Sequence, residues 1–308
     1  MREDFIKELT DIVGEDSVRY DEPMKYHTTF RIGGPADVFV TPADAVRLQE
    51  ALCCCRDYGV SYMVIGNGSN LLVGDRGIRG VVFRVSQTMN RVLFEDEPDG
   101  SVKIYAGAGT LLSRLSSIAA DKGLKGLAFA CGIPGSFGGA IAMNAGAYGG
   151  DMQSVVENAA VLLPDGDIKL LQADEMGFGY RTSVIQKENL IVLGASVRLQ
   201  RGHSQEILDE MEELSKRRRE KQPLEFPSAG SVFKRPQGYF AGKLIEDAGL
   251  KGFSVGDAQV SEKHCGFVIN TGDATAEDVL LLIRHIQKVV ADRFGVKLET
   301  EIKIVGEF

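Results

Sequence analysis

The 308-residue chain lacks tryptophan, has only five cysteines and four histidines, and carries a net charge of −8. No apolar run reaches the ~18–20 residues that a membrane-spanning helix needs, and the charged, helix-patterned N-terminal segment does not resemble a signal peptide. The cysteines are odd in number and three are adjacent, at positions 53–55, which is no disulfide framework. A reducing, cytoplasmic setting is therefore expected. The acidic balance argues against nucleic acid as the main partner, because phosphate backbones attract basic surfaces.

Several familiar sequence motifs are also missing. GNGSNL at 66–71 and GAGTLL at 107–112 both fail GxGxxG at the third glycine, and no P-loop is present. Without CxxC, HExxH or any metal-ligand spacing among the histidines, no metal site is expected. GFSVG at 252–256 matches GxSxG, but helix-like residues precede it where a nucleophile elbow needs a strand, so we interpret the match as chance.

Glycine is the residue that the chain has in excess, with 36 in total. Seven lie in CGIPGSFGGAIAMNAGAYGG at 131–150, and two further clusters lie in IGNGSN at 65–70 and YAGAGTLL at 105–112. Glycine among apolar residues marks backbone that something approaches closely, either another strand or a ligand. Three clusters, two of them directly after strand-like runs, favour a large ligand with phosphates, because exposed amides form anion-binding concavities.

Hydrophobic periodicity predicts a mixed α+β chain. Helices are expected at 2–13, 43–58, 110–122, 204–222, 241–248 and 274–294, the last with Asp273 as N-cap. Strands are expected at 36–42, 62–66, 80–85, 92–97, 102–109, 190–199, 266–270 and 298–305, with a hairpin at 159–172 that turns at Asp165-Gly166. The composition shifts near 201, which suggests a domain boundary. The basic run KRRREK at 216–221 could bind phosphate, although a solvated helix end is the commoner explanation.

Six segments, in order, resemble one known family. They are YHTTFRIGG, IGNGSNLL, GIPGSFGGAIAMNAGAYG, YRTS, PSAGSVFKRP and KHCGFVIN, which together span about 26–305. The chain is similar to the UDP-N-acetylenolpyruvoylglucosamine reductases, flavoenzymes that make UDP-N-acetylmuramate for peptidoglycan. The resemblance implies a two-lobed FAD-binding domain of the vanillyl-alcohol-oxidase type (1–86 and 87–200) and a smaller α+β substrate-binding domain (201–308). The chain resembles the shorter type of the family, without the tyrosine-bearing insertion that covers the substrate.

The resemblance also implies roles for individual residues. FAD would be bound by Gly66, Asn67, Gly68, Ser69 and Asn70 on one side and by Gly135, Ser136, Gly139 and Ala140 on the other. NADPH would be the hydride donor, and a UDP-sugar the substrate, with no obligate protein partner. Arg181, Ser231 and Glu301 match the catalytic residues, and Lys234, Lys251 and His264 are candidates for binding the substrate.

The chemistry assigns a task to each catalytic candidate. Negative charge develops beside the substrate carboxylate during the reduction, and a fixed guanidinium at Arg181 would stabilise it. Ser231 would donate the proton, which needs a dry site or a cation such as Lys234, because a free hydroxyl is a weak acid. Glu301 would lie near the substrate carboxylate. Two negative charges repel there, so the Glu301 carboxyl group would have to be protonated or paired with Arg181. Taken singly, each residue could instead be an ordinary surface or turn residue.

Two other functions stay open on the sequence. One is an oxidase or dehydrogenase of the same FAD-binding superfamily that acts on an alcohol or sugar. The other is a protein that binds nucleotide sugars without catalysis, although the glycine clusters would then have no task.

Overall fold

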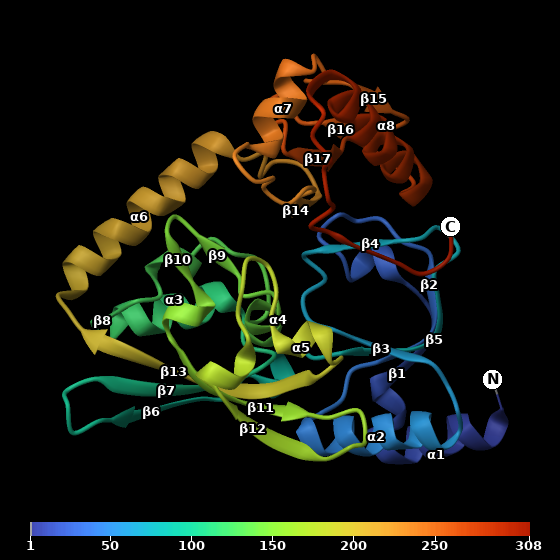
Figure 1. The fold of residues 1–308 in the computed structure, drawn as a ribbon. Helices are drawn as coiled ribbons and strands as arrows, with labels where there is room; N and C mark the ends of the chain where they lie inside the picture. The colour runs from blue at the N-terminus through green and yellow to red at the C-terminus, as the bar shows by residue number, and fades with distance from the viewer. Residues whose placement is uncertain (1) are drawn as a thin grey trace. The chain divides into compact units, whose positions relative to one another are not determined.

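The computed structural model describes residues 2–308 and confirms a mixed α+β fold. The helices are α1 (Glu3–Val13), α2 (Ala45–Asp57), α3 (Leu112–Asp121), α4 (Phe137–Ala142), α5 (Val184–Lys187), α6 (Ser204–Lys221), α7 (Ala241–Asp247) and α8 (Ala276–Phe294) (Figure 1). The longer strands are β1 (Val18–Pro23), β2 (Pro35–Val40), β3 (Tyr62–Ile65), β5 (Ile78–Arg84), β6 (Val92–Asp96), β7 (Val102–Gly107), β11 (Val156–Leu162), β12 (Ile168–Gln172), β13 (Ile191–Arg201), β14 (Ser228–Ser231) and β17 (Phe267–Asn270). Shorter strands are β4 (Leu71–Val73), β8 (Leu124–Lys125), β9 (Gly146–Ala147), β10 (Gly150–Asp151), β15 (Ser254–Val255), β16 (Ala258–Val260) and β18 (Lys303–Val305).

The chain divides into two compact units, and each is built from separate stretches of sequence. The N-terminal unit comprises residues 2–19, Phe39–Asn67 and Gly80–Arg218. The C-terminal unit comprises Tyr20–Val38, Gly68–Arg79 and Arg219–Phe308. Three of the boundaries fall inside β1, β2 and β5, so these strands pass from one unit into the other. The division at 86 and 200 that the family resemblance implies stays a prediction.

An antiparallel sheet dominates the N-terminal unit, with the strand order β12-β11-β13-β7-β6. The predicted hairpin is confirmed as β11 and β12, which pair from Asn158 opposite Gln172 to Leu162 opposite Ile168. Helix α4 packs against β13 and β7, on the side of the sheet where α3 also lies in Figure 1. The glycine-rich segment 131–150 is therefore held over this sheet.

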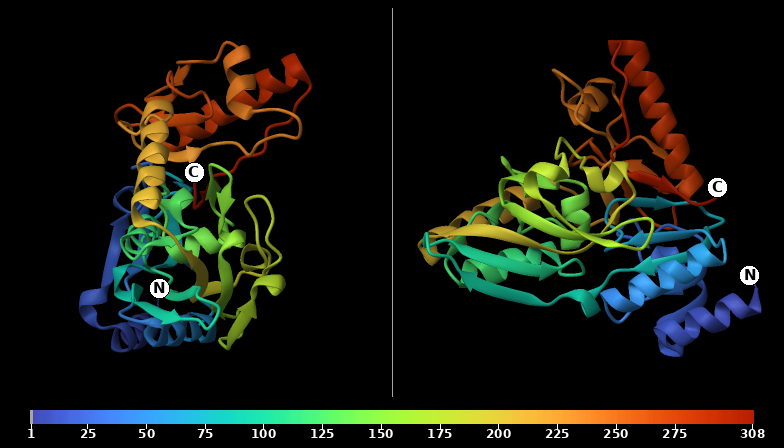
Figure 2. Two further views of the ribbon diagram at one scale, coloured as in Figure 1. Left: turned by 90° about the vertical axis from the view of Figure 1, so that its left-hand side faces the viewer. Right: turned by 60° about the horizontal axis from the view of Figure 1, so that its bottom comes forward.

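Helices α1 and α2 lie side by side in the same unit, and α2 carries the three adjacent cysteines (Figure 2). Helix α1 buries Phe5, Leu9 and Val13, which recur at four-residue spacing. Helix α2 buries Cys54 and Cys55, and burial raises their pKa values to about 11 and about 12. Because the thiolate is the reactive form, these raised pKa values disfavour reaction of Cys54 and Cys55 at neutral pH.

The C-terminal unit has a four-stranded sheet with the order β14-β17-β16-β15. Helix α8 packs on β15 and β16 through a buried stripe at three- and four-residue spacing: Val279, Leu282, Ile283, Ile286 and Val290. Phe30, Ile32 and Leu72 join the same hydrophobic core, although they precede the rest of it by more than a hundred residues. Their burial explains why two early segments belong to this unit.

Two details differ from the sequence-based expectations. Asp273 was the wrong N-cap: the cap of α8 is Thr275, whose Oγ1 accepts from the N–H of Asp278 at 3.0 Å, while the Asp278 carboxylate accepts from the N–H of Thr275. This reciprocal pair satisfies two otherwise unbonded donors, which one residue at 273 cannot do. The final strand is also shorter than 298–305: Lys303–Val305 pairs in parallel with β4, and Thr300 forms only an isolated bridge with Phe233.

Candidate functional site

The turn at residues 66–70 connects β3 to β4 and carries a row of unbonded backbone donors. Within residues 2–308, the N–H groups of Gly66, Asn67, Gly68 and Ser69 donate no hydrogen bond. The turn itself is fixed, because Asn67 Nδ2 donates to the carbonyl of Pro134 at 2.5 Å and Asn70 Nδ2 donates to the carbonyl of Glu301 at 3.1 Å. Successive free N–H groups on a fixed turn form an anion-binding concavity, which suits a pyrophosphate.

The glycines of this turn are required by the chain's own packing. A Cβ on Gly66 would lie 2.1 Å from Ser136 Oγ, and a Cβ on Gly68 would lie 1.9 Å from the carbonyl oxygen of His27. Gly68 also has a φ of +61°, which favours glycine. Both explanations of the glycine cluster therefore apply here. The Cα atoms of Gly66 and Gly68 pack closely against other residues of the protein, and the backbone N–H groups remain available to a ligand.

The second predicted cofactor segment, around 135–140, behaves differently. The N–H groups of Phe137 and Gly138 donate to the carbonyls of Thr110 and Ala108 at 2.7 and 2.9 Å. Ser136 caps α4, with its Oγ accepting from Gly139 N and its carbonyl from Ala140 N. These donors are consumed within the chain, whereas the N–H groups of Gly135 and Ser136 donate no hydrogen bond within the part of the chain that the structure describes. Gly139 and Ala140 can therefore permit close approach of a cofactor but cannot give it amide hydrogen bonds.

Arg181 lies in a strained loop of the N-terminal unit. Its φ is +55°, an uncommon conformation for a residue with a Cβ. Asn144 Nδ2 donates to the carbonyl of Gly179, and Ser183 Oγ to the carbonyl of Ala142, so the loop is tied to the C-terminal end of α4 and the residues just after it. The guanidinium donates to the carbonyl of Gly146 at 3.1 Å and lies 5.3 Å from the ring centre of Tyr180. The loop thus holds the charged group in one place.

Ser231 and Glu301 both belong to the C-terminal unit, and the fold brings their backbones together. The N–H of Glu301 donates to the carbonyl of Val232, the residue after Ser231, at 2.7 Å. Two residues further along each segment, the N–H of Lys234 donates to the carbonyl of Glu299 at 2.9 Å. The segment at 299–301 therefore runs beside 232–234. Ser231 also ends β14, opposite Phe267 of β17, which anchors it on the sheet.

The three predicted substrate-binding residues have different electrostatic character. Lys234 forms an exposed ion pair with Glu299, with Nζ and Oε2 3.4 Å apart, and Lys251 is exposed. His264 is partly buried, and burial lowers its pKa below the usual value. Its Nδ1 accepts from the N–H of Gly266 at 3.0 Å, so the neutral ring carries its proton on Nε2. His264 can therefore offer one neutral donor to a ligand, whereas the lysines offer charge.

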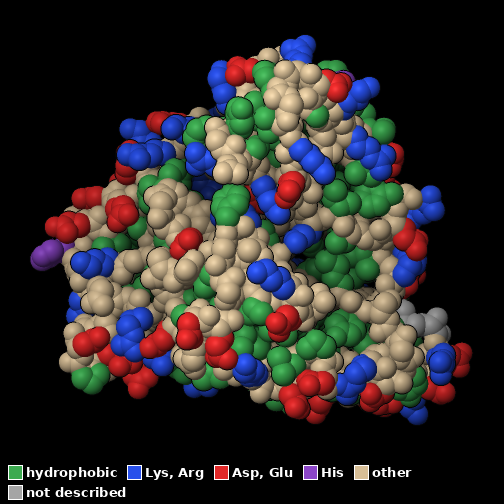
Figure 3. Space-filling view, viewed as in Figure 1, with side chains coloured by type: hydrophobic (Ala, Val, Ile, Leu, Met, Phe, Trp, Pro, Cys, Tyr) green, Lys and Arg blue, Asp and Glu red, His purple; other side chains and the backbone are tan. Residues whose placement is uncertain are grey.

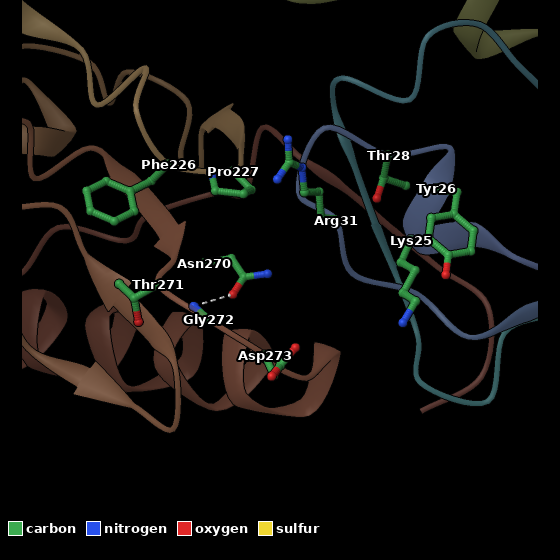
Figure 4. A pocket seen from close by; sticks show the side chains of 10 residues that line it. All are labelled: Lys25, Tyr26, Thr28, Arg31, Phe226, Pro227, Asn270, Thr271, Gly272 and Asp273. Atoms are coloured by element: carbon green, nitrogen blue, oxygen red, sulfur yellow. Dashed lines mark hydrogen bonds between the residues drawn. The ribbon is translucent and has the colours of Figure 1, made fainter.

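A separate pocket of about 660 Å³ opens in the C-terminal unit (Figure 4). It contains two cationic side chains, Lys25 and Arg31, one carboxylate, Asp273, and the buried amide of Asn270. The Asn270 amide is already bonded, since its Oδ1 accepts from the N–H groups of Gly272 and Ala274. None of the predicted site residues lines this pocket, and its lining comes from three distant segments, which leaves no local signal in the sequence.

Three general features of the described residues bear on the possible ligands and surroundings of the protein. On the face drawn in Figure 3, basic and acidic side chains are interspersed. Across residues 2–308 there is no group of three or more His, Cys, Asp or Glu that could hold a metal ion. In the same part of the chain, no helix combines the length and the apolar character needed to span a bilayer.

Comparison with known proteins decides the family. Residues 36–171 match the FAD binding domain family, and residues 222–305 match the C-terminal domain of UDP-N-acetylenolpyruvoylglucosamine reductase. The reductase of that name from Agathobacter rectalis is 50% identical to this chain, and the one from Caldanaerobacter subterraneus subsp. tengcongensis is 52% identical, each with both chains fully covered. The chain belongs to the UDP-N-acetylenolpyruvoylglucosamine reductase family.

A solved reductase of this family agrees with the fold. The enzyme from Thermus caldophilus superimposes with a TM-score of 0.78 at 37% identity, covering 93% of this chain and 97% of that one. The family resemblance and the FAD-binding fold class predicted from the sequence motifs are thus confirmed. The residue roles and the absence of the tyrosine-bearing insertion stay predictions.

Proposed function

We propose that this protein is an FAD-dependent reductase that uses NADPH to reduce the enolpyruvyl ether of UDP-N-acetylglucosamine enolpyruvate to UDP-N-acetylmuramate. One observation of the structure carries the proposal: four successive unbonded N–H groups at 66–69, inside the region that matches the FAD-binding family. The identity of about half of all residues to two reductases over their full lengths supports the substrate. As part of the same proposal, the protein is located in the cytoplasm and acts on its small-molecule substrate without an obligate protein partner.

The reduction adds a hydride at C3 and a proton at C2 of the enolpyruvyl group. Bound FAD, once reduced by NADPH, would supply the hydride. Arg181 would hold the substrate carboxylate and stabilise the charge that develops beside C2, and its bonded, restrained loop limits the reorganisation that this needs. Ser231 would donate the proton to C2.

Glu301 would act next to Ser231 in this scheme. Its backbone is fixed by the bond to Val232, so its carboxyl group is carried on a segment that lies beside the proton donor. Lys234 and Lys251 would contribute positive charge toward the diphosphate or carboxylate of the substrate, and His264 a neutral hydrogen bond from Nε2.

The visible spectrum of the purified protein is the first test. We expect the absorbance of oxidised flavin, its loss on anaerobic addition of NADPH, and rapid recovery when the enolpyruvyl sugar nucleotide is added. A colourless protein that takes up no FAD would rule out the proposal. Rapid recovery with O2 and no preference for the sugar nucleotide would instead indicate the oxidase alternative.

Substitution of Ser231 separates the two half-reactions. Ser231→Ala should leave bleaching by NADPH intact and slow reoxidation by the substrate about 10²–10⁴-fold, the usual contribution of a general acid. Ser228→Ala, in the same strand β14, is the matched control and should reoxidise at the wild-type rate. Normal turnover by the Ser231→Ala protein would show that another group donates the proton.

A further inference from the structure

The basic run at 216–221 contains one arginine that differs from its neighbours. Lys216, Arg217, Arg219 and Lys221 are exposed near the end of α6. Arg217 pairs with Glu213 one turn earlier, at 2.7 Å, in the manner of a solvated helix surface. Arg218 is the partly buried member of the run, and burial lowers its pKa. The run is therefore mostly a solvated helix end with a single inward-facing cation.

The side chain of Arg218 lies directly against Gly132, in the first glycine cluster. A Cβ added to Gly132 would meet Arg218 Cδ at 2.7 Å, Nη1 at 3.1 Å and Nε at 3.3 Å. The stem and the guanidinium thus cross the face of a residue that has no side chain. Any larger residue at 132 would displace them, so the glycine makes room for the arginine.

No acceptor within the chain compensates this cation. Among the residues that the structure describes, the Arg218 guanidinium forms no hydrogen bond and no ion pair. The ionisable groups that influence it are the Tyr148 hydroxyl and the Cys131 thiol, and neither is a carboxylate. Withdrawing a guanidinium from water without an anion costs free energy, so a partner from outside the chain is expected.

The position of Arg218 points to that partner. The carbonyl of Pro134, two residues after Gly132, accepts the hydrogen bond that fixes the turn with the four free N–H groups. The unbonded donors of Gly66 and Asn67 and the unpaired guanidinium therefore border one short segment, 132–134, within the N-terminal unit. We propose that Arg218 binds an anionic oxygen of the bound flavin dinucleotide. This inference rests on the proposed FAD binding and concerns a residue outside the predicted site.

Two oxygens of the dinucleotide have the required chemistry. One is on the pyrophosphate, which is charged in both redox states. The other is the C2 carbonyl of the isoalloxazine, which gains negative charge when the flavin is reduced. A guanidinium suits either, because its planar donors match paired oxygen acceptors.

The test compares Arg218→Met with Arg217→Met, a neighbouring exposed arginine on the same helix. FAD is titrated onto the full-length protein after its flavin has been removed, and the midpoint potential of each reconstituted protein is measured. We expect FAD binding at least tenfold weaker for Arg218→Met and within twofold of wild type for Arg217→Met. Gly132→Ala, which pushes on the same side chain, should weaken binding in the same direction.

The potential separates the two oxygens. Contact with the pyrophosphate predicts weaker binding with an unchanged potential, and little effect on FMN, which lacks the pyrophosphate. Contact with the isoalloxazine predicts a potential lower by about 30 mV for each tenfold preferential loss of reduced-flavin binding. Arg218→Lys keeps the charge without the planar guanidinium, so its loss of FAD affinity should lie between those of the wild-type protein and Arg218→Met. This variant replaces Arg218→Met in the test if the methionine protein does not fold.

An Arg218→Met protein with wild-type FAD affinity and wild-type potential would overturn the inference. The proposed function would survive that result, provided that the wild-type protein is yellow and is bleached by NADPH. A wild-type protein that binds no FAD would instead refute the proposed function itself.

Discussion

Replacement of Gly68 by alanine tests whether the turn at 66–70 is as constrained as its geometry indicates. The added Cβ would lie 1.9 Å from the carbonyl oxygen of His27 and 3.1 Å from the Cα of Thr28. Both neighbours are backbone atoms, so no side chain can rotate away to relieve the clash. The turn must move, and the row of N–H groups moves with it.

The magnitude follows from two separate costs. A non-glycine residue in the left-handed region costs about 1–2 kcal/mol, and forcing an extra carbon into a packed site costs about 1–3 kcal/mol. Gly68→Ala should therefore destabilise the protein by about 2–5 kcal/mol. Gly295→Ala is the matched control, because Gly295 has a similar φ of +67° with nothing within 4 Å of an added Cβ, and it lies in the same unit. Gly295→Ala should therefore destabilise the protein only through the left-handed backbone conformation, by about 1–2 kcal/mol.

Chemical denaturation of both flavin-free variants, together with FAD titration, measures the difference. The Gly68→Ala protein should unfold at a clearly lower denaturant concentration than the Gly295→Ala protein. It should also bind FAD at least tenfold more weakly, whereas Gly295→Ala should bind it normally. Equal stabilities for the two variants would refute the steric argument, and an unchanged FAD affinity for Gly68→Ala would refute the assignment of this turn to the pyrophosphate.

Two further predictions concern the helices. Thr275→Ala should lower the free energy of unfolding by about 1 kcal/mol because it removes the N-cap of α8, whereas Asp273→Ala should cost less; denaturant midpoints check this, and the reverse order would restore Asp273 as the cap. Cys54 and Cys55 should resist alkylation of the folded protein at about pH 8, because burial raises both pKa values above the usual range. Their contribution to stability should be complete below the unfolded thiol pKa of about 9 and should be lost as the pH rises toward 11 and 12, since the unfolded state ionises first. Peptide mapping after alkylation, and unfolding as a function of pH, measure these effects; rapid labelling of Cys55 in the native state would contradict them.

The candidate site was only partly visible in the sequence. Glycine content indicates where the backbone can be approached closely, but it does not show where each N–H group is directed. At 66–69 the donors are free, whereas those of Phe137 and Gly138 are taken by carbonyls of the preceding segment. Bonded and unbonded backbone donors thus occur in segments of similar glycine content. Likewise, the basic run gave no indication that only Arg218 turns inward.

Elements whose causes are local could be predicted from the amino-acid sequence. Hydrophobic periodicity gave the positions of α1, α6 and α8 and of the hairpin β11–β12, because side-chain spacing and turn chemistry act within a few residues. The ordered motifs gave the family, because each depends on residue identity alone. These inferences needed no knowledge of which segments meet.

Contacts between distant segments could not be predicted in this way, because they depend on how the whole chain folds. Asp75 accepts hydrogen bonds from the first N–H groups of α8, at Ala276 and Glu277, across about 200 residues of chain. The bond between Glu301 and Val232 likewise brings a terminal segment beside Ser231. Such bonds form because burial of a shared core brings the segments together, and that core includes Phe30 and Leu72. Nothing in the local sequence specifies the partner, since any carboxylate or carbonyl could accept the same bond.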